Sequence, residues 1–234
     1  YAIGEIFLVV IGILIALQIN NWNELRKQNI RSTEYHERIS DDLSLLINQS
    51  DNLYEHASQI LTSITRTVEL LESGTLETDE DKQTVDYAMV WFSRTSYQLP
   101  ELPTYVEMMS NGDINLIYDV NLRTDIANFN NFLKQVASVV LKLSNAIEVD
   151  FRVFNRHLRS HVDPVSLEVM YTYDFEKMAS DKEFVNTFSR LAYHWRGYVY
   201  FLQRVNEGGI DLQSKVEARL DNTTKLHSPE IQSN

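Results

Sequence analysis

The chain opens on a long apolar stretch that turns polar after about twenty residues. Twelve of the residues from 3 to 19 are Ile, Leu, Val or Phe. As a helix, such a stretch spans the roughly 30 Å hydrocarbon core of a bilayer. Its summed insertion free energy, about −5 kcal/mol, outweighs the cost of one carboxylate, Glu5, near the end. We therefore predict a transmembrane helix over residues 1–21, with Trp22 as its membrane-interface anchor.

One face of this predicted helix carries Glu5, Gly12 and Ala16, which are seven and four residues apart. Small residues let helix backbones approach closely in lipid, and a partner on this face would remove Glu5 from the hydrocarbon. The spacing therefore favours a membrane helix-packing face. The alternative is that Glu5 lies at the membrane surface and the small residues have no packing role.

Polar residues dominate positions 22–38, which predicts a solvated helical stalk that projects from the membrane. The next apolar positions alternate steps of four and three, as in the seam of a coiled coil or bundle. A flanking row at intervals of seven widens the stripe, which favours a multi-helix bundle. The seam comprises Ile39, Leu43, Leu46, Ser50, Leu53, Ala57, Ile60, Ile64, Thr67 and Leu71, and the flanking row comprises Ile47, Tyr54, Leu61 and Val68.

Glycine and capping residues divide the middle of the chain into shorter helices. Gly74 is expected to end the first helix, and the acidic run 78–81 to begin a second one that reaches about Ser96. A short helix from Thr104 to Asn111 should stop at Gly112, with another turn starting at Asp113.

Two long helices are predicted in the second half of the chain. Apolar spacing extends the first from residue 122 to 158, with Asp163-Pro164 ending it. Residues 165–175 are expected to form a loop or one short strand. A capping box at Ser180–Glu183 should open the second helix, which Gly208-Gly209 should break or kink. The prediction is an all-α protein, with a helical bundle over residues 39–220 and a mobile polar tail over residues 221–234.

Composition narrows the classes of function. The net charge is −12 and the pI about 4.9, which argues against nucleic-acid binding because phosphate contacts need a positive surface. The absence of cysteine excludes disulfides and thiolate metal sites but leaves the compartment open.

Candidate chemistry is sparse. His157 and His161 lie four residues apart, a spacing that can hold zinc. The absence of a zincin glutamate, the neighbouring positive charges of Arg156 and Arg159 and a favourable interaction with the helix dipole favour a role without metal. No phosphate loop, nucleophile elbow or dinucleotide fingerprint is present. We therefore assign no catalytic, cofactor or metal site. An aromatic cluster at residues 193–201 covers more than one helix face, so we expect another helix or subunit to cover the second face; the alternative is a core plus an interface or ligand pocket.

The opening YAIGEIFLVVIGILIALQINNWNE resembles a family of bacterial single-span proteins that is described only as a domain of unknown function. The stretch TYVEMMSNGDINLI at residues 104–117, followed by Asp119, Leu122, Arg123 and Ile126, is similar to the same family. The resemblance implies a basic segment before the span, hence a cytoplasmic N-terminus and a periplasmic bulk domain on the bacterial inner membrane. Consistent with this, the chain begins at Tyr1 rather than Met, so we expect upstream sequence.

Two alternatives concern the opening segment. The mixed charges after the span, such as Arg26 and Lys27 beside Glu24, by themselves weakly favour a cytoplasmic carboxyl side. A cleaved signal peptide competes with a stable anchor, but Ala16-Leu17-Gln18 offers no small-x-small cleavage site.

The leading functional hypothesis is a non-enzymatic interaction or scaffold protein, anchored in membrane lipid. It would either form a homo-oligomer or serve as an accessory subunit with other membrane proteins. The alternative is a sensory or small-molecule-binding bundle that signals through a partner. A third hypothesis, an enzyme, would need a buried polar constellation that the sequence does not reveal.

Overall fold

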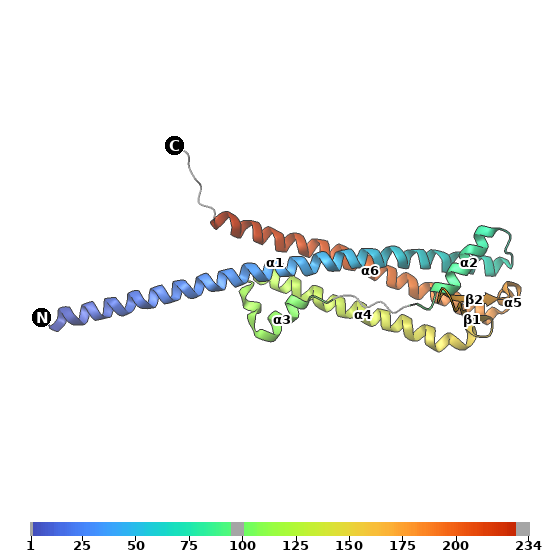
Figure 1. The fold of residues 1–234 in the computed structure, drawn as a ribbon, viewed down its shortest axis with the longest axis horizontal. Coiled ribbons are helices and arrows are strands. Elements are labelled where there is room, and N and C mark those ends of the chain that lie inside the picture. Colours follow the sequence, from blue (N-terminus) through green and yellow to red (C-terminus); the bar gives the residue numbers. More distant parts are fainter. Residues whose placement is uncertain (1, 95–100, 228–234) are drawn as a thin grey trace, which may run out of the picture. The chain divides into compact units, whose positions relative to one another are not determined.

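The computed structural model describes residues 2–94 and 101–227, with side chains from 8–94 and 101–220. The all-α prediction is confirmed, apart from one small hairpin. The elements in chain order (Figure 1) are α1 (Ala2–Ser73), α2 (Asp79–Trp91), α3 (Pro103–Asn111), the 3-10 helix η1 (Asp113–Leu116), α4 (Val120–Phe154), β1 (Leu158–Val162), β2 (Val169–Tyr173), α5 (Phe175–Ser180) and α6 (Lys182–His227).

The chain divides into two compact units. Unit 1 comprises residues 1–44, 102–128 and 210–234, and unit 2 comprises residues 45–101 and 129–209. Helices α1, α4 and α6 contribute residues to both units.

Three helix boundaries lie where the capping residues predict them. Gly74 and Gly112 follow α1 and α3 with φ angles of 70° and 75°, a left-handed conformation that glycine adopts without steric cost. Thr78 precedes α2, and its hydroxyl accepts a 3.0 Å hydrogen bond from the backbone N–H of Asp81. The predicted end of α2 at Ser96 differs, because α2 ends at Trp91; residues 95–100 lie outside the described part of the chain.

The predicted seam of α1 is buried. Nine of its ten positions are buried and Leu53 is half-buried, while all four residues of the flanking row are half-buried. A stripe of this width is typical of a helix that packs against several neighbours rather than against one partner.

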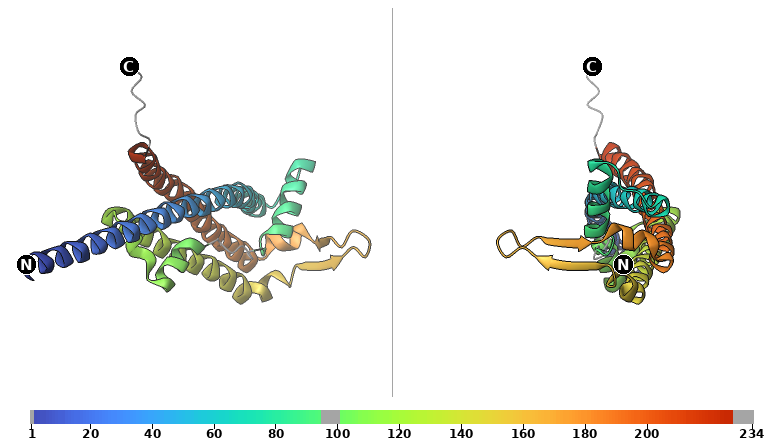
Figure 2. Two further views of the ribbon diagram at one scale, coloured as in Figure 1. Left: turned by 60° about the vertical axis from the view of Figure 1, so that its left-hand side comes forward. Right: turned by 90° about the vertical axis from the view of Figure 1, so that its right-hand side faces the viewer.

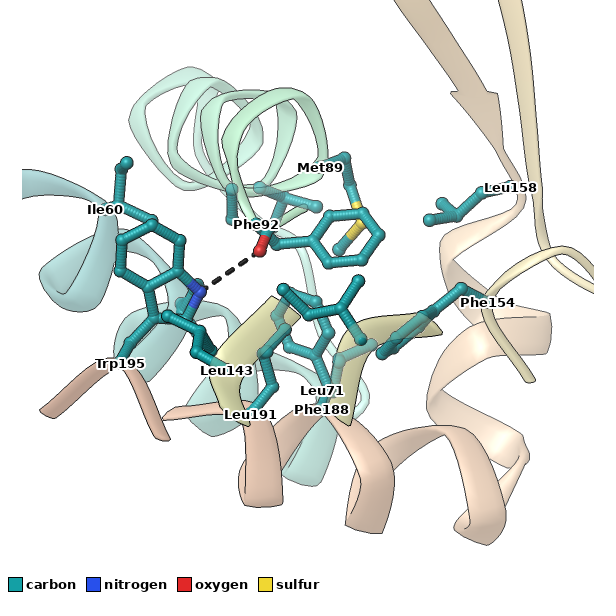
Figure 3. Packing of buried hydrophobic residues seen from close by; sticks show 14 of the residues in the cluster. Ile60, Leu71, Met89, Phe92, Leu143, Phe154, Leu158, Phe188, Leu191 and Trp195 are labelled. Carbon is teal, nitrogen blue, oxygen red and sulfur yellow. Dashed lines mark hydrogen bonds between the residues drawn. The ribbon is translucent and has the colours of Figure 1, made fainter. Parts of the chain in front are cut away.

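Aromatic side chains fill the centre of unit 2 (Figure 3). The rings of Phe92, Phe154, Phe184 and Phe188 form five contacts with centroid separations between 4.7 and 6.2 Å. Trp195 is fully buried, and its indole N–H donates a 3.1 Å hydrogen bond to the carbonyl of Phe92, just after α2. This bond satisfies a polar ring nitrogen that would otherwise be buried without a partner.

The predicted helix over residues 122–158 is wrong at its carboxyl end. Helix α4 ends at Phe154, and the chain then forms an antiparallel hairpin in which Leu158 pairs with Tyr173 and Val162 with Val169 (Figure 2). The predicted loop or single strand is thus the second half of a hairpin. Leu158 is buried beside the aromatic core, so apolar spacing continues past the true helix end and could not reveal it.

The predicted features of α6 also need correction. The residue that caps its start is Asp181 rather than Ser180, because the Asp181 carboxylate accepts the backbone N–H groups of Glu183 and Phe184. The glycines do not break the helix, which continues unbroken to His227. A Cβ on Gly208 would lie 3.0 Å from the Phe129 ring, so the absence of a side chain serves close packing.

The structure adds detail to two predicted regions, the stalk and the tail. The stalk predicted for residues 22–38 is exposed throughout residues 22–31, whereas its second part has one buried face with Ser32, Tyr35 and His36. The tail predicted to begin at residue 221 is still helical to His227; its residues 228–234 lie outside the described part of the chain.

Candidate functional site

The first part of α1 exposes its apolar side chains on every side. From Leu8 to Ile19 the large apolar residues are 48% to 75% exposed. Among the described residues, one helix is long and apolar enough to cross a membrane, and it contains this segment. None of the residues in its most apolar window is buried within the chain. Exposed apolar surface costs roughly 25 cal/mol per Å² in water, so lipid or a partner is the favourable environment for this segment.

The predicted site residues of this helix have different outcomes. Gly12 and Ala16 are both exposed, and a Cβ placed on Gly12 would meet nothing within 4 Å. Trp22 is 64% exposed. The Glu5 side chain lies outside the described residues. The helix surface at Gly12 and Ala16 is therefore open, and its role in packing stays a prediction, as does the interface role of Trp22.

In unit 1, Asp113 links η1 to α1. Its Oδ2 accepts hydrogen bonds from the Arg31 guanidinium at 2.5 Å and from the Tyr35 hydroxyl at 2.7 Å. The hydrogen bond to Asp113, and then burial, raise the pKa of the Tyr35 phenol above its ordinary value. The Ser32 hydroxyl donates to the Leu116 carbonyl at 2.6 Å. These contacts hold η1 against α1 about nine residues after Trp22, or roughly 14 Å along a helix.

Helix α3 is attached to α1 by two further polar contacts. The backbone N–H of Thr104 donates to the Asp42 carboxylate at 2.8 Å, which supplies the cap that the Leu102 side chain cannot. Arg38 forms an ion pair with Glu107. Asp42 therefore has a structural partner at the start of α3.

Helices α4 and α6 are joined in unit 1 by carboxylates as well. Asp119 accepts the backbone N–H groups of Leu122 and Asn121 at the start of α4 and pairs with Arg219. The hydrogen bond from Leu122 holds the pKa of Asp119 below its usual value. The hydrogen bond from Asn121 and the charge of Arg219 act in the same direction, against partial burial. Hydrogen bonds to Asp125 and Asp211 raise the pKa of Lys215 to about 12.

The histidine pair does not have the helical spacing that suggested zinc. His157 lies in the turn after α4, and its Nε2 is 2.8 Å from the Asp181 carboxylate, while His161 is exposed on β1. The hydrogen bond with His157 is the largest cause that lowers the pKa of Asp181. Within the described residues, no group of three or more potential ligands could hold a metal ion.

The aromatic cluster divides into two faces. Trp195 and Tyr198 are buried in unit 2, whereas Tyr193 is 69% and Tyr200 57% exposed. The inner face is therefore core, and the outer face lines a cavity between α4 and α6.

Sequence reasoning did not single out the linking carboxylates of unit 1. Asp113 was named only as the start of a turn, and both Asp113 and Asp119 belong to the 104–126 stretch that carried the family resemblance. Charge pattern gives no signal for such links, because their partners Arg31 and Arg219 lie 82 and 100 residues away in sequence.

The family comparison matches the amino-terminal part of the chain. The model of a family of unknown function, DUF6090, covers residues 5–139, more than half of the chain. That range contains the apolar helix together with Asp42, Asp113 and Asp119. No curated protein and no solved structure matches the chain significantly. The chain belongs to the DUF6090 family of unknown function.

Proposed function

We propose that this chain is a membrane-anchored helical interaction protein of the bacterial inner membrane, with its bulk domain in the periplasm and no catalytic activity of its own. It would self-associate or serve as an accessory subunit of a larger membrane complex. The observation that carries the proposal is the exposed apolar segment of α1, which continues as one helix into the packed seam.

The contacts of unit 1 support a role in positioning. Polar links tie η1, α3 and the neighbouring part of α6 to α1 within the 44 residues that begin at the amino terminus. A partner bound to the apolar segment would therefore bind the same helix that organises unit 1. Gly12 and Ala16 leave open surface on that segment, as close helix packing in lipid requires.

The association test changes the open face and compares it with the opposite one. Gly12→Leu adds bulk on the predicted packing face, whereas Leu14→Phe adds bulk about 200° around the helix. Mass measurement of the full chain in native nanodiscs should show an oligomer or a stoichiometric partner. Gly12→Leu should lower the associated fraction and Leu14→Phe should leave it unchanged. If the unaltered chain is a monomer with no bound partner, the proposal is overturned. If both variants lower the associated fraction equally, Gly12 and Ala16 are not the packing face.

The periplasmic orientation can be tested separately, because the chain has no cysteine. Glu80→Cys introduces one exposed thiol at the start of α2. A membrane-impermeant maleimide should label it in intact spheroplasts. Labelling that requires lysis would place the bulk domain in the cytoplasm and contradict this part of the proposal.

A further inference from the structure

A cavity of about 390 Å³ opens between α4 and α6 in unit 2. Two contacts show that these helices are antiparallel here. The ion pair of Arg190 with Asp150 at 2.6 Å lies on one side of the cavity, and the ring contact of Phe132 with Phe201 lies on the other. Residues near 142 on α4 are therefore opposite residues near 196 on α6. The volume lies within the usual range for small-molecule sites.

The charge of this cavity opposes the charge of the chain. Lys142 from α4 and Arg196 from α6 both line it, and its lining contains no carboxylate. Among the described residues, neither cation forms an ion pair, although the adjacent Arg190 does. The chain has 33 acidic residues against 21 basic ones, so a lining with two cations and no carboxylate is opposite in sign to the chain as a whole. An anion between them would gain charge-assisted hydrogen bonds.

Two exposed tyrosines flank the same cavity. Tyr193 and Tyr200 lie seven residues apart on one face of α6, so their backbones are separated by about 10 Å along the helix. The faces of aromatic rings favour stacking with flat apolar groups. The two exposed tyrosine rings can therefore contact a flat apolar group from both ends of the cavity, beside the two cations.

Gly197 lies between the tyrosines and leaves the helix surface bare. A Cβ at this position would meet nothing within 4 Å, whereas a Cβ at Gly208 of the same helix would lie 3.0 Å from a phenylalanine ring. Glycine inside a helix is less favourable than alanine. Packing explains Gly208 but not Gly197, whose missing side chain instead widens the cavity.

We propose that this cavity binds a small anion with a flat apolar body, of the aromatic carboxylate class. Lys142 and Arg196 hold the carboxylate, and the flat body lies over Gly197 between Tyr193 and Tyr200. The site is independent of association through the membrane helix, because it is formed by residues of unit 2 alone.

The test measures binding of three probes to the detergent-solubilised full chain by isothermal titration calorimetry, with detergent-only titrations as the reference. 2-Naphthoate has both features, 2-naphthalenemethanol has only the flat body, and inorganic phosphate has only the charge. We expect saturable binding of 2-naphthoate with a dissociation constant on the order of 1 mM or lower. The other two probes should bind at least about tenfold more weakly, and added salt should weaken 2-naphthoate binding. No saturation by 2-naphthoate, or equal binding of the neutral alcohol, would overturn the proposal.

Two variants and a control locate the site. Gly197→Leu fills the floor of the cavity and should weaken 2-naphthoate binding at least about tenfold, and Arg196→Gln should weaken it about fivefold or more. Arg159→Gln removes an exposed cation of β1, outside the cavity, and should change binding less than about twofold. If Gly197→Leu lowers the melting temperature of the chain, its weaker binding is not informative, and the effect of Arg196→Gln on 2-naphthoate binding tests the location of the site. Undiminished binding by the folded variants would place the ligand elsewhere and refute the assignment.

Discussion

Replacing Trp195 by phenylalanine separates the two contributions that this residue makes to unit 2. The indole is fully buried among residues of α1, α2, α4 and α6, and its N–H donates to the Phe92 carbonyl at 3.1 Å (Figure 3). Phenylalanine keeps an apolar ring but removes the donor and reduces the volume. The change therefore tests whether the hydrogen bond after α2 contributes to stability.

The expected magnitude follows from two terms. A buried carbonyl that loses its partner costs about 1–3 kcal/mol. The missing volume is roughly 40 Å³, which at about 24 cal/mol per Å³ costs about 1 kcal/mol more. We therefore expect the free energy of unfolding to fall by about 2–4 kcal/mol for Trp195→Phe.

Urea unfolding of the full chain in nonionic detergent, followed by far-ultraviolet circular dichroism, measures this change. The midpoint should fall while the slope stays the same, because the exposed area on unfolding is unchanged. Tyr200→Phe is the matched control, since Tyr200 is 57% exposed and should shift stability by less than about 0.5 kcal/mol. A loss below about 1 kcal/mol for Trp195→Phe would refute the assigned role of the hydrogen bond.

Three further predictions concern other parts of the chain. Gly197→Ala should raise the free energy of unfolding by about 0.5–1 kcal/mol, because alanine favours a helix and its Cβ meets nothing. Gly208→Ala should be at least about 1 kcal/mol less stable than Gly197→Ala, because the added Cβ would crowd the Phe129 ring. Equal urea midpoints for the two variants would contradict this. Because the pKa of Asp119 is lowered in the folded chain, its stabilising effect is present above the usual carboxyl pKa and is lost as the pH falls through the folded value. The melting temperature of Asp119→Asn should therefore fall less steeply than that of the unaltered chain below about pH 4, and parallel curves would exclude this linkage. Asp113→Leu removes the acceptor of the Tyr35 hydroxyl, so amide hydrogen exchange in η1 should quicken at least about tenfold while exchange in unit 2 stays unchanged; equal quickening in both would show that Asp113 acts on the whole chain.

The helix ends that were predicted correctly depend on short-range chemistry. Gly74, Thr78 and Gly112 act on backbone groups within a few residues of themselves. A left-handed glycine or a capping hydroxyl needs no distant partner, so its effect is visible in the sequence. The buried seam of α1 is visible for a similar reason, because the helical period places its residues on one face.

The hairpin after α4 and the unbroken α6 were not predictable in this way. Leu158 continues the helical spacing but lies on a strand, because the buried cluster of unit 2 accepts its side chain there. Gly208 suggested a break, yet close approach of the Phe129 ring favours glycine inside a continuous helix. In both cases packing against distant residues outweighs the local preference.

The candidate sites show the same division. The apolar segment was predictable because it needs only composition and spacing, whereas the packing role of Gly12 and Ala16 stays a prediction. The Asp113 link and the cavity beside Gly197 were not, since each depends on residues brought together from separate helices. The tyrosines at 193 and 200 were noted as an excess of aromatic residues, but only their exposure distinguishes them from the core.

The sequence by itself determined a family of unknown function, an almost entirely helical chain and an apolar first helix suited to a membrane, because composition, period and caps act locally or additively along the chain. Only the tertiary structure decided which charged side chains form ion pairs and which do not. An ion pair or a cavity depends on distances between residues far apart in sequence, such as Arg31 with Asp113 and Lys142 opposite Arg196. These distances arise only when the helices pack, and they carry the ligand site proposed for this chain.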